Sequence, residues 1–309
     1  MIYCVLLNPS LDVCYSVGEL RPGTTETDVP SEIHPAGKAL NAAKVIRTLG
    51  EDVCVVGIMP RNNRTAFESY CRKHGIHTDF YAVDGSVRVN ATVTESETGQ
   101  TTHLSSRGPR YAVRIQDEFA AFVNERLREG DTWVFSGSLP HGFEGGVYAT
   151  LIQECHHRGI RTYLDARGDA LRMGVRAKPD TIKPNLGELE AFFEEHIEGI
   201  RHIALKGKRL LDMGVGRVFV SLGEDGMIAL HENDCLLCSV PSVPAVDTVG
   251  CGDAVVAGVV VGTVRNFSFS ETCRMAAACG VSNALHPGPG AVRLDEVWRI
   301  MEEVAIENA

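Results

Sequence analysis

Asp247-Thr248-Val249-Gly250-Cys251-Gly252-Asp253 precedes an apolar run of helical length, residues 254–264. Two glycines on either side of one residue predict a tight turn that leads into the N-terminus of a helix. Such a turn directs several unpaired backbone N–H groups to one spot. Together with the positive end of the helix dipole, these donors from Gly250, Cys251 and Gly252 predict an anion-binding site.

Asp253 lies at the rim of this predicted anion site. A carboxylate there would repel a phosphate that the loop merely bound, but it suits a general base that takes a proton from an attacking hydroxyl. An anion hole beside a base therefore predicts phosphoryl transfer. A structural alternative stays open, because glycines are common before apolar helices and Asp is a common helix cap.

Two other nucleotide-binding motifs are excluded by inspection. A dinucleotide fingerprint needs a third glycine where Val255 stands, and it belongs after an early strand. The chain also has no Gly-x4-Gly-Lys-Ser/Thr loop of the Walker type.

The composition is that of a globular enzyme. The 309 residues suffice for one large α/β domain, with 44% hydrophobic and 23% charged residues. The net charge of −10 argues against a general affinity for nucleic acid or acidic membranes, so an anionic substrate requires a local basic pocket. Without a long apolar span or a signal peptide, we expect a cytoplasmic location.

The ten cysteines are scattered, which predicts small buried apolar residues rather than disulfides. Only Cys235 and Cys238 have a spacing typical of metal ligands. Because no second Cys/His pair accompanies them, a plain strand is the favoured interpretation.

Alternating strand and helix patterns predict an α/β fold with a mainly parallel sheet covered on both faces. Two polar, β-branched segments, about 13–34 and 87–106, interrupt this pattern. We expect them to form a small β lid, inserted in a single domain of residues 1–309, that closes over the site and excludes water. The Val-rich run after Asp253 favours a strand by propensity, but its length and the preceding turn favour a buried helix.

Several polar residues follow predicted strands or begin predicted helices. In open α/β sheets, ligands bind at the carboxyl ends of the strands. Asp12 lies at such an end and suits substrate hydroxyls, although Asp is also common in turns. Lys38 and Asn41, beside the Gly37 turn, suit a sugar or phosphate oxygen, and a solvated lysine is the alternative.

The lid carries candidate phosphate ligands. Arg88 and Asn90 alternate on one face of a lid strand. A guanidinium can bind a phosphate through two parallel hydrogen bonds, so Arg88 is the first candidate for a phosphate clamp and Arg107 the second. Gly137 lies in a small-residue turn that permits close approach of the backbone to a ligand.

Two further segments suit a metal and a nucleotide. Asn185 and Glu188 are three residues apart at a predicted helix start and could hold Mg²⁺ directly or through water. A capping Asn with a first-turn Glu is an equal alternative. A turn from Gly223 to Gly226 suits nucleotide phosphates or ribose, and a plain hairpin has the same sequence.

Taken together, these motifs resemble the PfkB family of ribokinase-like carbohydrate kinases over nearly the whole chain. The family's Asp-Thr-x-Gly-Ala-Gly-Asp signature matches 247–253, with Cys251 in place of Ala. Its Gly-Gly-Lys-Gly-x-Asn pattern matches 36–41. Segments 8–12, 88–90, 136–140 and 183–188 resemble the branch of 1-phosphofructokinases and tagatose-6-phosphate kinases.

The resemblance implies a ribokinase-like fold and ATP-dependent phosphorylation of a sugar hydroxyl, with a ketohexose phosphate as the first candidate substrate. Asp253 would be the base, and the amides of Gly250, Cys251, Gly252 and Asp253 the anion hole. The lid would also mediate a homodimer. On the sugar-phosphate side the resemblance implies Asp12, Gly37, Lys38, Asn41, Arg88, Asn90 and Gly137, with Arg107 added from its position. On the nucleotide side it implies Lys183, Asn185, Ser221, Gly223, Gly226 and Asn283, and for Mg²⁺ it implies Asn185 and Glu188.

The sequence departs from the family pattern at several positions. Ala36 and Ala39 replace glycines of the substrate loop, Ala254 replaces a Ser after the base, and residues 105–109 differ from the usual lid exit. Two other functions therefore stay open: a kinase of an unphosphorylated sugar, nucleoside or cyclitol, and a non-catalytic sugar or nucleotide sensor. Lys38 and Arg88 separate the first from a phosphosugar kinase, because an unphosphorylated substrate would leave both cations unpaired.

Overall fold

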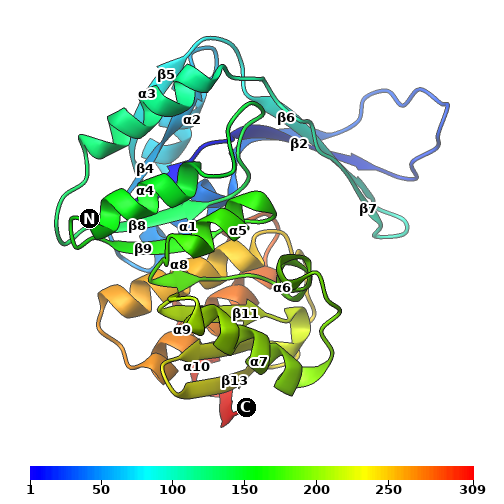
Figure 1. Cartoon of the computed structure of the whole chain (residues 1–309). Coiled ribbons are helices and arrows are strands. Elements are labelled where there is room, and N and C mark those ends of the chain that lie inside the picture. The colour runs from blue at the N-terminus through cyan, green and yellow to red at the C-terminus, as the bar shows by residue number, and fades with distance from the viewer.

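The computed structural model describes all 309 residues and contains two β-sheets (Figure 1). The larger sheet has ten strands in the following spatial order: β14 (Ala305–Asn308), β13 (Asp234–Ser239), β12 (Met227–His231), β11 (Arg217–Ser221), β10 (Thr181–Ile182), β9 (Arg161–Asp165), β8 (Thr132–Ser136), β1 (Ile2–Leu6), β4 (Val53–Pro60) and β5 (His77–Val83). All neighbouring pairs from β5 to β11 are parallel. The three remaining pairs, β11–β12, β12–β13 and β13–β14, are antiparallel. The predicted mainly parallel sheet is confirmed.

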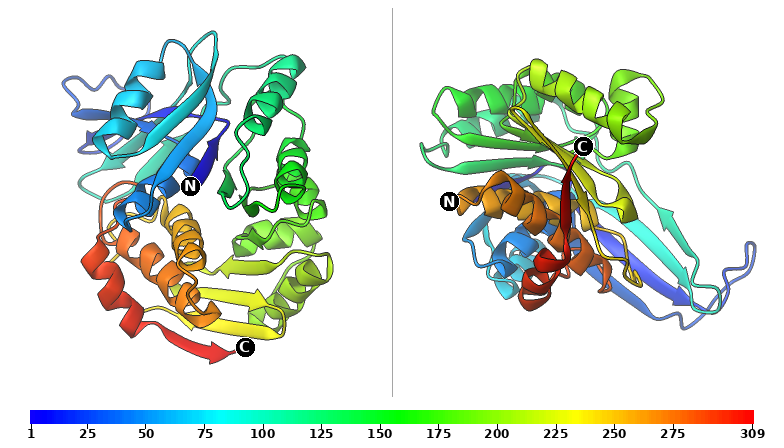
Figure 2. Two further views of the ribbon diagram at one scale, coloured as in Figure 1. Left: turned by 90° about the vertical axis from the view of Figure 1, so that its left-hand side faces the viewer. Right: turned by 90° about the horizontal axis from the view of Figure 1, so that it is seen from below.

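Helices cover both faces of this sheet, as the left view of Figure 2 shows. One layer consists of α1 (Lys38–Thr48), α2 (Arg64–Lys73), α8 (Cys251–Val264), α9 (Phe269–Ala284) and α10 (Leu294–Glu303). The other consists of α3 (Val113–Asn124), α4 (Val147–His156), α5 (Asp169–Arg176), α6 (Leu186–Phe193) and α7 (Gly199–Asp212). Each layer packs on its own face of the sheet and buries a separate hydrophobic cluster. None of these helices has both the length and the hydropathy that crossing a bilayer would need.

The two segments predicted to form a lid contribute the smaller sheet. Its strands are β3 (Ser31–Ala36), β2 (Ser10–Val17), β6 (Arg88–Glu95) and β7 (Thr101–Leu104), in that spatial order. In Figure 1 these strands extend to the right, away from the large sheet. The strands lie within about three residues of the predicted segments 13–34 and 87–106, and β6 and β7 pair as an antiparallel hairpin.

Helix α8 settles the ambiguity of the Val-rich run in favour of a helix. All of its residues from Asp253 to Gly262 are buried, between the sheet, α1 and α9. Gly258 permits this packing, because a Cβ there would lie 2.6 Å from the Cα of Ala276 on α9. Burial on all sides outweighs the strand preference of the valines.

Cys235 and Cys238 both lie on β13, as the strand interpretation predicted. Residues three apart on a strand point to opposite faces. Cys235 accordingly packs with one hydrophobic cluster of the sheet and Cys238 belongs to the other. The two sulfurs therefore cannot bind one metal ion.

Candidate active site

Polar residues converge at one edge of the large sheet. Strands β1, β8, β9, β10 and β11 are parallel, so their carboxyl ends share this edge. The residues at or just after these ends are Asn8, Gly137, Asp165, Lys183 and Ser221. The fold thus brings together segments that are up to 213 residues apart in the sequence.

The loop before α8 is held by side chains. The Asp247 carboxylate accepts hydrogen bonds from the backbone N–H groups of Val249 (2.9 Å) and Gly288 (3.0 Å). Gly250 precedes the helix with φ 84°, and a Cβ there would lie 2.7 Å from the Cβ of Pro289. Only glycine fits this position, so the turn predicted from the sequence is confirmed.

The first turn of α8 leaves backbone donors free. The N–H groups of Gly252 and Asp253 have no acceptor within the chain, whereas the Cys251 N–H donates a long hydrogen bond (3.4 Å) to the Thr248 carbonyl. The helix has 14 residues, so its dipole adds positive potential at this end. The anion site predicted from the sequence thus rests mainly on the amides of Gly252 and Asp253.

Cys251 supplies a backbone position rather than a reactive thiol. Burial raises the pKa of its Sγ, which lies 3.5 Å from Asn283 Nδ2. The side chain therefore stays protonated and packs against the loop.

Asp253 is buried, with 5% of its surface exposed, and its Oδ2 accepts a hydrogen bond of 2.8 Å from Asn41 Nδ2. Burial raises the pKa of Asp253 to about 6, although the nearby Lys38 ammonium acts in the opposite direction. The carboxylate is therefore ionised at neutral pH and is a stronger base than an exposed aspartate.

This pKa predicts a pH dependence of turnover. Since a general base acts only when deprotonated, kcat should be level above pH 7 and should fall about tenfold per pH unit below pH 6. The measurement is kcat against pH at saturating substrates. A kcat that stays level down to pH 5 would contradict the assignment of the base.

A second buried carboxylate, Asp165, joins two lysines. Lys38 Nζ lies 3.0 Å from Asp165 Oδ2, and Lys183 Nζ lies 3.4 Å from Asp165 Oδ1. Burial would raise the pKa of Asp165, but the two ammonium groups outweigh it and lower the pKa. Burial would lower the pKa of Lys38, and the carboxylates of Asp165 and Asp253 raise it instead. Asp165 and Lys38 therefore stay charged next to Asp253.

A cavity of about 240 Å³ lies between the lid and this edge of the sheet. Its lining includes Arg88, Asn90 and Ser105 from the lid, and Lys38, Gly137 and Arg167 from the main sheet side. Asn90 Nδ2 donates to Asp12 Oδ1 (2.8 Å), which places Asp12 behind the lid wall. Gly37, Asn41 and Asp253 do not line the cavity, and Asn41 and Asp253 lie in the buried cluster beside Lys38.

Arg88 lies in this wall with an unpartnered donor. Its Nη2 donates to the Asn8 carbonyl (3.3 Å), but its buried Nε has no partner. Burial lowers the pKa of Arg88, and Asp12 opposes this shift. A half-buried guanidinium suits an anion, and the role of Arg88 as a phosphate ligand stays a prediction.

Asn185 and Glu188 form a capping box at the start of α6. Asn185 Oδ1 accepts from the Glu188 N–H (2.8 Å), and Glu188 Oε2 accepts from the Asn185 N–H (3.0 Å). The structural alternative considered for this pair is thus present. Glu188 Oε1 has no hydrogen bond within the chain, and both residues line a second cavity of about 670 Å³ next to the first. No cluster of three His, Cys, Asp or Glu side chains suits a metal held by protein alone.

The other predicted nucleotide residues surround the end of β11. Ser221 is its last residue, and its N–H donates to the Pro184 carbonyl beside Lys183. Gly223 and Gly226 bound a tight turn between the antiparallel strands β11 and β12, so the hairpin alternative describes this local structure. Asn283 is fully buried and donates to the Val249 carbonyl (2.9 Å) while accepting from the Gly290 N–H (2.8 Å). Contact of these residues with a nucleotide stays a prediction.

Arg107 does not join the cavity wall. Its side chain is exposed and outside the lining residues. Its proposed contact with a phosphate also stays a prediction.

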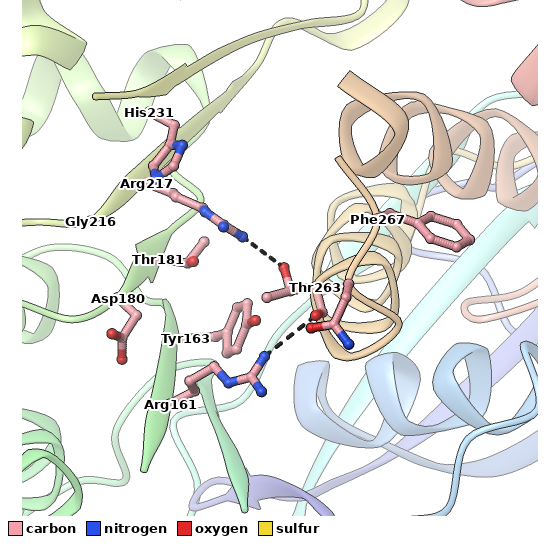
Figure 3. A pocket seen from close by; sticks show the side chains of 10 residues that line it. Arg161, Tyr163, Asp180, Thr181, Gly216, Arg217, His231, Thr263 and Phe267 are labelled. Carbon is pink, nitrogen blue, oxygen red and sulfur yellow. Dashed lines mark hydrogen bonds between the residues drawn. The ribbon is translucent and has the colours of Figure 1, made fainter. Parts of the chain in front are cut away.

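A separate cavity of about 430 Å³ lies at the opposite edge of the sheet, where β9, β10 and β11 begin (Figure 3). Arg161 and Arg217 reach across it to Thr263, in the last turn of α8. Guanidinium groups at a helix C-terminus stabilise the helix dipole. This pair therefore secures the far end of the helix that carries Asp253.

Two residues at the site were not predicted from the sequence. Asp165 is the last residue of β9, and Arg167 follows it in the loop before α5. The available signal was their position at the carboxyl end of a buried parallel strand. The pairing of Asp165 with Lys38 and Lys183 depends on the order of strands in the sheet, which no local pattern contains.

Comparisons with known proteins identify carbohydrate kinases that are similar to this chain. A family described as "pfkB family carbohydrate kinase" matches residues 13–295. The 1-phosphofructokinase of Haemophilus influenzae is 30% identical over 307 residues, 99% of this chain and 97% of the relative. The tagatose-6-phosphate kinase of Staphylococcus epidermidis is 27% identical over 309 residues, covering 99% of each chain. The structure of phosphofructokinase-2 from Escherichia coli has a TM-score of 0.91 at 23% identity, covers 98% of each chain and supports the fold.

Proposed function

Because the chain belongs to the pfkB family of carbohydrate kinases, we propose that it transfers the terminal phosphoryl group of ATP to a hydroxyl of a ketohexose phosphate. The enzyme is a phosphotransferase with an alcohol group as acceptor. Relatives named for fructose 1-phosphate and tagatose 6-phosphate chemistry support a phosphosugar as the acceptor.

The observation that carries this proposal is the half-buried guanidinium of Arg88 in the wall of the cavity, which has no ion pair with a carboxylate. An unphosphorylated sugar, nucleoside or cyclitol would leave this cation without a counter-charge, at a cost of about 1–3 kcal/mol. A phosphate would supply the counter-charge. The phosphosugar is therefore favoured over the unphosphorylated alternatives.

In the proposed mechanism, Asp253 takes the proton of the attacking hydroxyl and Asn41 holds the carboxylate in place. The free N–H groups of Gly252 and Asp253 stabilise the negative charge that grows on the transferred group. The Lys183 ammonium lies beside Gly252, where a Cβ would be 3.4 Å from its Nζ. It adds positive charge at the same point.

The site also suits Mg²⁺, which ATP brings to most kinases. Mg²⁺ keeps several waters and takes one or two carboxylates besides phosphate oxygens. Glu188, with Oε1 free, fits the role of the single carboxylate, with Asn185 fixing its position through the capping box. The metal would neutralise phosphate charge.

A coupled assay of ADP release tests the proposed function. It compares fructose 1-phosphate, fructose 6-phosphate and tagatose 6-phosphate with fructose and tagatose, each with Mg²⁺ and with EDTA. We expect at least one phosphorylated sugar to exceed its parent in kcat/KM, and EDTA to abolish turnover. Faster turnover of an unphosphorylated sugar would overturn the proposed acceptor, and full activity in EDTA would overturn the proposed metal.

Arg88→Ala tests the phosphate clamp. We expect KM for the phosphorylated substrate to rise about tenfold or more, because a charge-assisted hydrogen bond is lost, while the unphosphorylated parent changes little. The measurement is kcat/KM for both sugars. Equal losses for both would remove Arg88 from the clamp.

We also propose that the lid mediates a homodimer. Val13, Ile33, Ala91 and Leu104 are cross-strand neighbours and form an apolar row over all four lid strands. Ile33 and Leu104 are each 60% exposed, whereas Asp12 and Asn90 alternate with this row and belong to the polar face toward the cavity. An exposed apolar sheet face suits a second copy of the same face.

Analytical ultracentrifugation tests the dimer. The wild-type protein should sediment with the mass of two chains, and Ile33→Glu should sediment with the mass of one chain. A wild-type protein that sediments as a monomer would refute the dimer.

A further inference from the structure

Arg167 lies at a position that joins the two cavities of the site. It follows β9 by two residues, in the loop before α5, and it lines both the 240 Å³ cavity and its larger neighbour. The main sheet side of the smaller cavity thus carries a cation opposite the lid.

Arg167 is a cation without a partner. Its side chain is exposed at the cavity wall and makes no hydrogen bond or ion pair in the structure, although the chain has 40 acidic residues against 30 lysines and arginines. The third cation of the cavity, Lys38, is paired with Asp165. Only Arg88 and Arg167 therefore have guanidinium donors free for a ligand in this cavity.

Arg88 and Arg167 belong to opposite walls of the cavity. Arg88 begins β6 of the lid, and its buried Nε has no partner. Burial lowers the pKa of Arg88, and the like charge of Arg167 lowers it further. The two carboxylates that also line the cavity are already engaged, Asp165 by Lys38 and Lys183 and Glu188 by the Asn185 N–H. The two guanidinium charges repel each other, and an anion between them would relieve this repulsion.

We propose that Arg88 and Arg167 bind the same phosphate group of the substrate from opposite sides, which makes Arg167 a specificity-determining residue. The inference rests on the proposed function. A phosphate has three terminal oxygens and can accept hydrogen bonds from both guanidinium groups. Bound in this way, it links the lid to the edge of the main sheet, so substrate binding and lid closure are coupled.

Titration calorimetry without ATP tests the clamp directly. The ligands are fructose 1-phosphate, fructose 6-phosphate, tagatose 6-phosphate and fructose, and the proteins are wild type, Arg167→Ala and Arg201→Ala. Arg201 is an exposed residue of α7 that lines neither cavity, so its replacement removes the same charge elsewhere. We expect Arg167→Ala to raise the Kd of the tightest-bound sugar phosphate about tenfold or more and to leave fructose unchanged. Arg201→Ala should change neither.

Two further variants separate a specific clamp from a loss of structure. Arg167→Lys keeps the charge without the planar fork and should give an intermediate Kd. In the Arg88→Ala/Arg167→Ala double variant, the combined loss should differ from the sum of the single losses, because both groups bind one phosphate. Thermal unfolding of each variant checks that it is folded.

The outcomes distinguish this inference from the proposed function. A wild-type protein that binds a sugar phosphate but transfers no phosphoryl group to it would overturn the function, and the effect of Arg167→Ala on Kd would still decide the clamp. A normal Kd in Arg167→Ala, or equal weakening of phosphorylated and unphosphorylated sugars, would overturn the clamp alone. A wild-type protein that binds no sugar phosphate would overturn both.

Discussion

Replacing Asp253 with asparagine should lower kcat by roughly 10²–10⁴, the usual contribution of a general base. The substitution keeps the size of the side chain and its contact with Asn41, but an amide cannot take the proton of the attacking hydroxyl. ATP should still bind, because the backbone donors of Gly252 and Asp253 are unchanged. The measurements are kcat and the rise in melting temperature that ATP produces.

Asp247→Asn is the matched control. Asp247 belongs to the same loop, and its carboxylate holds the N–H groups of Val249 and Gly288. An asparagine oxygen can keep part of this contact, so turnover should fall far less than in Asp253→Asn. Nearly normal turnover in Asp253→Asn, or equal losses in both variants, would contradict the base.

Asp253→Asn should also change the stability of the protein. The folded-state pKa of Asp253 lies above its ordinary value, so the folded protein holds this proton to higher pH than the unfolded chain. The contribution of the group to stability is therefore greatest below about pH 4 and is lost as the pH rises through about 6. Asp253→Asn should unfold at a higher temperature than wild type at pH 8, and this difference should shrink at pH 4.

Asp165→Asn should have the second large effect, a loss of about 3–5 kcal/mol in unfolding free energy. Asp165 is 1% exposed and binds both Lys38 and Lys183, and Lys183 is itself 5% exposed. Without the carboxylate, Lys183 becomes a buried cation without a counter-charge. Denaturant unfolding at pH 7 measures the loss.

Asp79→Asn provides the comparison, because it breaks a partly exposed ion pair with Arg126. Such a pair contributes at most about 1 kcal/mol. Since the folded-state pKa of Asp165 is lowered, its contribution is present above its ordinary pKa and is lost as the pH falls below it. If Asp165→Asn cost no more than Asp79→Asn at neutral pH, the charge cluster would not stabilise the site.

The sequence predicted the elements whose local pattern agrees with their burial. The run after Asp253 is helical because the glycine turn and its length outweigh valine propensity. Other elements were not predicted, namely β5, β14, α5 and α7. β5 is an edge strand of the sheet, half-buried and polar in part. β14 has four mostly exposed residues and exists only through pairing with β13, which no local pattern reveals.

Local sequence patterns also predicted only part of the candidate site. Motif spacing predicted Asp253, Arg88 and the Asn185–Glu188 pair as site residues, because each prediction depends on neighbours in the sequence. It could not find Asp165 or Arg167 as site residues. Asp165 pairs with lysines from α1 and from the end of β10, and Arg167 shares a cavity with Arg88 of β6, so both positions follow from sheet order and lid placement.

The most direct test is a crystal structure with a non-hydrolysable ATP analogue and the sugar phosphate bound. We expect the terminal phosphate of the ATP analogue to lie within hydrogen-bond distance of the Gly252 and Asp253 amides. We also expect the acceptor hydroxyl of the sugar phosphate to lie within about 3 Å of an Asp253 carboxylate oxygen. A nucleotide whose terminal phosphate lies away from the N-terminus of α8, or an Asp253 carboxylate that faces no substrate, would contradict the proposed mechanism.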